Sequence, residues 1–136
     1  MFEKEIIIDA SNATLGRLAS YAAKQALQGK KIIILNSEKA IVTGRKKFII
    51  TKYKERKELG GKFIQKGPYF SRSPEKIVKR TIRGMLPYKK GKGRGAFKRI
   101  LCYKGIPEEY KDKKMFKAGK EKHTAYINIE EIARII

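Results

Sequence analysis

The sequence is poor in the residues that build covalent or metal-bound scaffolds. Its 136 residues include one cysteine, Cys102, and one histidine, His123. A single cysteine excludes an internal disulfide, and together the two residues cannot build a Cys/His zinc module. We therefore expect no metal and no cofactor, with Cys102 acting as a small core residue on an apolar strand and His123 as a surface or docking residue.

Long hydrophobic runs are also missing. No apolar run approaches the roughly 18 residues of a membrane span, and the N-terminal MFEKEIII breaks into charge where a signal peptide would stay apolar. Because 41% of the residues are hydrophobic, the chain can still fold around a core. We expect a single soluble, intracellular domain over residues 1–136, in the cytoplasm and with no membrane partner.

Acidic residues are scarce, and the excess of positive charge is concentrated. The chain has 34 Lys and Arg against 13 Asp and Glu, a formal net charge of +21. Residues 45–104 hold 21 of these cations and only three acids, a net +18. A membrane-binding face would need a strong apolar stripe beside the charge, whereas Gly and Pro break this segment into short helical patterns. Nucleic acid is the favoured partner.

The first 44 residues predict a β-α-β unit. Short apolar runs suggest strands at residues 6–9 and 31–36, with a helix over 14–28 between them. Thr14 is expected to cap that helix and Gly29 to end it. Further strands are expected at residues 40–44 and 99–103. The fold class is α/β, a three-layer α/β/α domain with a basic helical and loop insertion. The helix face expected to be buried comprises Leu15, Leu18, Ala19, Ala22 and Ala26.

Two basic helices are expected next. The first spans residues 45–59, with Phe48, Ile49 and Tyr53 inward. The second begins at Ser73 and Pro74 and stops before Pro87, with Ile77, Val78, Ile82 and Met85 inward. Its opposite side carries four cations at i, i+3, i+4 and i+7, which we call the cationic stripe: Lys76, Lys79, Arg80 and Arg83.

The loop over residues 62–74 interleaves cations with aromatic residues. Lys66 and Arg72 are candidate phosphate clamps. Tyr69 and Phe70 either stack on unpaired bases or pin the loop to the core.

Residues 84–99, GMLPYKKGKGRGAFKR, form the basic glycine segment. Gly91, Gly93 and Ala96 have the G-x-G-x-x-G/A spacing of a dinucleotide loop, but no strand precedes them and no G-K-[ST] motif is present. The small residues instead suggest a loop whose backbone approaches a ribose-phosphate chain, with cations on either side. The candidate RNA-binding residues are Arg83, Lys89, Lys90, Lys92, Arg94, Lys98 and Arg99.

A nucleotide-dependent RNA-modifying enzyme remains the alternative, and a nonspecific DNA-binding protein is a third. Asp9, Ser11 and Thr14 follow a strand, where an α/β sheet places its ligand crevice. Capping and turn formation explain these residues better. We therefore predict no catalytic residue.

The last segment, residues 105–136, is interpreted as a tail with a C-terminal docking helix. Ile129, Ile132, Ala133 and Ile136 recur at helical spacing after Asn128, a possible cap. This apolar face is expected to dock onto the domain or onto a neighbouring protein.

Several motifs carry a resemblance that spans nearly the whole chain. IDASNATLGRLAS, LNSEKAIVTG, KGPYFSRSP, RTIRGMLPYKKGKGRGAFKRILCYKGIP and AYINIEEIARI occur in this order. They resemble the ribosomal protein family of the large subunit numbered thirteen, in its shorter archaeal form. The sequence departs from the longer bacterial form at residues 54–62, KERKELGGK, where that form is rich in His and Gly.

The resemblance implies an α/β/α fold with a four-stranded parallel sheet. It implies large-subunit rRNA as the ligand, neighbouring large-subunit ribosomal proteins as partners, and a structural, assembly-promoting role without catalysis.

Overall fold

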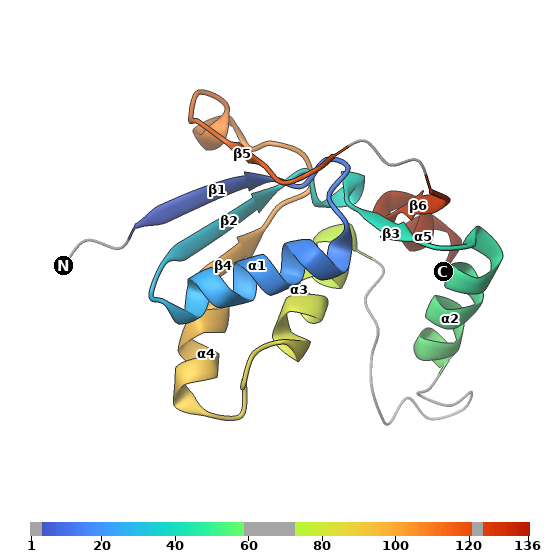
Figure 1. Cartoon of the computed structure of the whole chain (residues 1–136), viewed down its shortest axis with the longest axis horizontal. Helices are drawn as coiled ribbons and strands as arrows, with labels where there is room; N and C mark the ends of the chain where they lie inside the picture. The colour runs from blue at the N-terminus through green and yellow to red at the C-terminus, as the bar shows by residue number, and fades with distance from the viewer. Residues whose placement is uncertain (1–3, 59–72, 121–123) are drawn as a thin grey trace.

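The computed structural model describes residues 4–58, 73–120 and 124–136. Its centre is a sheet of four parallel strands in the order β4-β2-β1-β5 (Figure 1). The strands are β1 (Glu5–Asp9), β2 (Lys31–Leu35), β4 (Ile100–Cys102) and β5 (Phe116–Lys117). The expected α/β fold with a four-stranded parallel sheet is confirmed.

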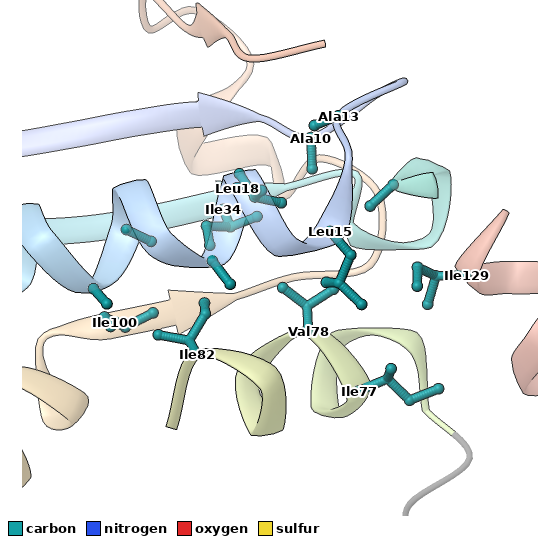
Figure 2. Close-up of a cluster of buried hydrophobic side chains, with 14 of the residues drawn as sticks. Ala10, Ala13, Leu15, Leu18, Ile34, Ile77, Val78, Ile82, Ile100 and Ile129 are labelled. Atoms are coloured by element: carbon teal, nitrogen blue, oxygen red, sulfur yellow. The ribbon is translucent and has the colours of Figure 1, made fainter. Parts of the chain in front are cut away.

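Both faces of the central strands are buried, because successive residues of a strand point to opposite sides. One face joins the core under three helices, α1 (Leu15–Leu27), α3 (Pro74–Gly84) and α4 (Gly91–Lys98). Figure 2 shows this core, where Leu15, Leu18, Ile34, Val78, Ile82 and Ile100 converge. The other face packs Ile7, Ile33 and Leu35 against Tyr110 of the short 3-10 helix η2 (Glu108–Tyr110). The outer layer on that side is thus one helical turn with its flanking segments.

Helix α1 confirms the expected β-α-β unit. Its five predicted inward residues are all buried, and Gly29 follows the helix end with a φ of +93°. Thr14 occupies the N-cap position, but its side chain makes no capping hydrogen bond. The prediction that Thr14 caps the exposed amides is therefore wrong.

The third expected strand does not join the central sheet. β3 (Ile41–Thr43) pairs antiparallel with β6 (Tyr126–Asn128), and Val42 lies opposite Ile127. A 3-10 turn, η1 (Ser37–Lys39), precedes β3, and β1 is already flanked by β2 and β5. The fourth strand of the central sheet is therefore β5, which has only two residues, both exposed.

Helices α2 (Lys46–Glu58) and α5 (Ile129–Ile135) pack beside the small sheet (Figure 1). Ile49 and Tyr53 of α2 are buried as expected, but Phe48 is 70% exposed. Ile49 and Tyr53 are one helical turn apart and define the inward face, so the residue before Ile49 points away from it. The prediction of an inward Phe48 is wrong.

Side chains of α5 are packed into the domain. Ile129 and Ile132 are fully buried, and Glu131 forms an ion pair with Lys46 of α2. Lys57 of α2 donates a hydrogen bond to the main-chain carbonyl of Ile136. The C-terminal helix thus joins α2 to the core by apolar and polar contacts together.

Candidate nucleic-acid interface

Helix α3 separates a buried face from a cationic one. Ile77, Val78 and Ile82 are almost completely buried, as expected. Met85 was expected to be inward but is 43% exposed, because the helix ends at Gly84 and Leu86 takes the buried place beyond it. Of the cationic stripe, Lys76 and Arg83 are exposed, whereas Lys79 and Arg80 are half-buried.

Two cations of the stripe contact aromatic rings near α4. The Lys79 ammonium lies 4.9 Å from the centre of the Phe97 ring in α4. The Arg83 guanidinium lies 5.0 Å from the Tyr88 ring in the turn between the helices. Such cation–π contacts contribute roughly 0.5–1 kcal/mol when exposed. They add to the buried contacts that already join α3, the turn and α4.

The basic glycine segment is not a loop throughout. Residues 91–98 form α4, which follows a turn closed by the Lys90 amide and the Pro87 carbonyl at 3.0 Å. Local propensity opposes this helix, since three of its eight residues are glycine. Tertiary contacts override propensity here, because Ala96 is fully buried in the main core.

Gly93 and Gly91 have different surroundings. A Cβ atom at Gly93 would lie 1.9 Å from the Pro87 carbonyl oxygen, so only glycine lets α4 approach the turn this closely. A Cβ atom at Gly91 would meet nothing within 4 Å. The close approach expected of these glycines is therefore made to protein backbone at Gly93, while Gly91 faces open space.

Most of the candidate RNA-binding cations are exposed on this part of the molecule. We define the α3–α4 surface by seven side chains: Lys76, Arg83, Lys89, Lys90, Lys92, Arg94 and Lys98. Among the described residues no carboxylate lies within ion-pair distance of any of the seven. The first turn of α4 also contains no acid. The positive end of that helix therefore adds to the attraction for anions.

Arg99 is used differently from its neighbours. It is half-buried, and its Nε and Nη2 atoms donate hydrogen bonds to the carbonyl of Ala26 at 3.2 and 2.7 Å. These bonds satisfy the C-terminal end of α1. The other predicted residues Lys66, Arg72, Tyr69 and Phe70 lie outside the described residues, as does His123.

The side chains considered for catalysis have structural roles. Oδ1 of Asp9 accepts hydrogen bonds from the Ser11 amide and hydroxyl and from the Asn36 side chain, at 3.0, 2.8 and 3.0 Å. Partial burial opposes ionisation of Asp9, but these hydrogen bonds outweigh burial and lower its pKa. A carboxylate so stabilised is a poor general base.

Cys102 is equally unsuited to chemistry. Burial raises the pKa of its thiol to about 12, which leaves almost no nucleophilic thiolate at neutral pH. Within residues 4–58, 73–120 and 124–136, no group of acids, cysteines and histidines could hold a metal ion. The same ranges contain no helix that is both long and apolar enough to span a membrane.

Comparison with known proteins distinguishes a ribosomal protein from an RNA-modifying enzyme. The profile of the family described as Ribosomal protein L13 matches residues 3–109, well over half of the chain. The chain belongs to the ribosomal protein L13 family. The resemblance inferred from the sequence motifs is confirmed.

Full-length relatives support the assignment. Large ribosomal subunit protein uL13 of Archaeoglobus fulgidus is 42% identical over 136 residues, covering 96% of this chain and 86% of that protein. The protein of the same name from Methanocaldococcus jannaschii is 45% identical over 131 residues, covering 94% of each chain. Membership of this family identifies a structural component of the ribosome and not an enzyme. The alternative of an RNA-modifying enzyme is therefore rejected.

One group of exposed side chains comes together only in the folded chain. Tyr21 of α1 and Phe116 of β5 stack with ring centres 5.7 Å apart, and Arg17 and Lys117 lie beside them. These residues come from segments almost a hundred positions apart, and β5 has no apolar run to reveal it. No signal in the sequence joins them.

Proposed function

We propose that this chain is a structural protein of the large subunit of cytoplasmic ribosomes, where it binds large-subunit rRNA and promotes assembly. The observation that carries the proposal is the α3–α4 surface, with seven exposed cations and no carboxylate partner among the described residues. Cations arranged in this way neutralise phosphates and release condensed counterions. Because the relatives are named large ribosomal subunit proteins, we propose neighbouring proteins of that subunit as further partners.

The mechanism that we propose is cross-linking of RNA segments by one rigid surface. The Lys79–Phe97 and Arg83–Tyr88 contacts fix α3, the turn and α4 relative to one another. Because the backbone that carries these cations is already held in place, binding costs little backbone entropy, and the surface can fix the relative positions of two RNA segments. Lys66 and Arg72 as clamps, and Tyr69 and Phe70 as stacking residues, remain proposals of the same kind.

A salt titration tests this function. Lys89, Lys90, Lys92 and Arg94 are replaced together with Gln, and binding to a large-subunit rRNA fragment is measured over a range of salt concentrations. Each lost phosphate contact should flatten the slope of log affinity against log salt by roughly 0.7–0.9, so four contacts predict a change of about three.

A matched variant controls for total charge. Lys24, Lys39, Lys111 and Lys114 are exposed, belong to other parts of the chain and are replaced with Gln in the same way. This control loses the same charge and should keep most of the slope. Equal slopes in the wild type and the α3–α4 variant would contradict the proposed interface. Competition by duplex DNA as effective as that by the rRNA fragment would favour nonspecific DNA binding instead.

A further inference from the structure

A second surface lies at the edge of the central sheet that β5 forms, opposite the edge formed by β4. The chain leaves β1 through α1 to β2 on one side, whereas β5 lies on the other side of β1. In open parallel sheets, ligands bind beyond the carboxyl ends of the strands at such a switch point. Helix α1 begins there, directly after the loop that leaves β1.

Two adjoining hollows lie at this point, and both are lined by Thr14 and Arg17 of α1. The first, of about 260 Å³, also takes in Tyr21, Phe116 and Lys117. The second, of about 460 Å³, extends to Arg45 at the start of α2. We call the two together the α1 groove. The second hollow falls within the size range of small-ligand pockets, roughly 300–1,000 Å³, and the first lies just below that range.

The wall of the α1 groove is aromatic and exposed. The Tyr21 and Phe116 rings are stacked at an interplanar angle of 26°, and the two residues remain 36% and 53% exposed. An exposed aromatic ring offers a flat apolar surface on which any of the four nucleobases can stack. A nucleotide placed there would remove this apolar area from water.

The rest of the groove is positive. Arg17, Lys117 and Lys120 line the first hollow, and Arg45 lines the second. Among the described residues no carboxylate lines either one. The nearby Asp9 does not line the groove; it accepts hydrogen bonds from Ser11 and Asn36 and also interacts electrostatically with Lys117. The charge of the groove therefore complements a phosphate.

The groove is also held in place by backbone packing. A Cβ atom at Gly119 would lie 1.8 Å from the carbonyl oxygen of Ser11, and the Ala118 amide donates to the Asp9 carbonyl at 3.3 Å. The segment that carries Phe116 and Lys117 is thus fixed against the loop before α1. Such preorganisation reduces the entropic cost of binding.

We propose that the α1 groove binds one unpaired nucleotide of an RNA chain. The base covers the Phe116–Tyr21 pair, and the phosphate lies near Arg17 and Lys117. This inference rests on the proposed function of RNA binding. It concerns the α1 groove, which is separate from the α3–α4 surface and would bind single-stranded RNA.

Binding of three probes by the full-length chain tests the proposal: single-stranded oligoadenylate, an RNA duplex and free AMP. Phe116→Leu keeps the wall apolar but removes the stacking ring, and should weaken oligoadenylate binding about 5- to 150-fold. Phe48→Leu is the matched control, because Phe48 is exposed on α2 and does not line the groove. It should bind oligoadenylate like the wild type, and duplex binding should not respond to Phe116→Leu.

Three results would overturn the inference. The first is oligoadenylate binding that Phe116→Leu leaves unchanged. The second is free AMP binding as tightly as oligoadenylate, which would make the groove a mononucleotide site. The third comes from ultraviolet cross-linking of intact large subunits, if peptides containing Tyr21 or Phe116 carry protein adducts instead of RNA.

Failure of the inference can be told from failure of the proposed function. The α3–α4 Gln variant is measured in parallel against the rRNA fragment. If it loses salt slope while Phe116→Leu has no effect on oligoadenylate, the groove inference fails and the function stands. If the α3–α4 variant keeps its slope while Phe116→Leu weakens oligoadenylate binding, the groove inference stands and the proposed main interface fails.

Discussion

Residues 1–44 and residues 45–104 meet different physical demands. The first segment carries six Lys and Arg against four acids, and α1 buries a face of Leu and Ala on the sheet. The second carries 21 Lys and Arg against three acids, and α3 and α4 attach it to the core through a few buried side chains. The buried side chains of the first segment build the core, while its exposed Arg17 and Tyr21 line the α1 groove. In the second, the residues that hold the fold and the residues that meet a polyanion are different ones.

This division can be tested first within α3. Ile82 is fully buried in the main core, whereas Lys76 is exposed on the same helix. Ile82→Ala should lower the free energy of unfolding by about 2–5 kcal/mol, because it removes buried methyl groups and leaves a cavity. Lys76→Gln should change stability by less than about 0.5 kcal/mol. Urea unfolding of both variants measures the difference, and equal losses would show that the division is false.

Glycines of α4 provide the next test. Gly93→Val should destabilise the chain by about 2 kcal/mol or more, because the new side chain meets the Pro87 carbonyl. Gly91→Ala should instead stabilise the helix by up to about 1 kcal/mol, since alanine has the higher helix propensity and nothing lies within 4 Å. Thermal unfolding compares the two. A mild effect of Gly93→Val would mean that the turn can move away from α4.

These two glycines also show how far the sequence could be interpreted. Strands β1 and β2 and helix α1 were predictable, because the Ile runs and the Leu/Ala spacing report burial directly. Helix α4 was not, since its glycines disfavour a helix and the contact that requires Gly93 is made with a turn. The amino-acid pattern indicates which side chains are buried. It gives much less information about which backbone segments come into close contact.

Strand pairing was the second limit. β3 looks like a strand, but its partner β6 lies more than eighty residues later, and nothing local distinguishes an antiparallel partner from a place in the parallel sheet. The exposed Phe-Lys of β5 has no strand pattern at all. The candidate RNA-binding cations were predictable from composition, because charge without nearby acids is visible in the sequence. The different role of Arg99 and the α1 groove depend on tertiary contacts and were not.

Arg99 and Lys98 offer a smaller test, on adjacent residues. Arg99→Gln should cost about 1–2 kcal/mol of stability, because it removes the two hydrogen bonds to the Ala26 carbonyl. Lys98→Gln should leave stability unchanged and weaken rRNA binding, as its side chain is exposed on the α3–α4 surface. Unfolding and salt-titration measurements on both variants separate the roles. Loss of RNA affinity without loss of stability in Arg99→Gln would return Arg99 to the interface.

The smallest expected effect concerns Asp9, which belongs to the first segment. Hydrogen bonds from Asn36 and Ser11 lower its pKa in the folded chain, although partial burial works against them. A carboxyl group whose pKa is lower in the folded than in the unfolded chain stabilises the fold above its unfolded pKa of about 4. This contribution is lost as the pH falls through the folded pKa. Asp9 should therefore favour the native state at neutral pH and contribute progressively less in acid.

Substitution of Asp9 isolates that contribution. Asp9→Asn removes the titrating group, so the difference in unfolding free energy between the wild type and the variant should stay constant from pH 7 to about pH 5. Below about pH 4.5 it should shrink, because the wild-type carboxylate becomes protonated and loses its advantage. Urea unfolding at a series of pH values measures this difference. A difference that grows as the pH falls would mean that the folded state raises the pKa of Asp9, and that burial, not the Ser11 and Asn36 hydrogen bonds, dominates the end of β1.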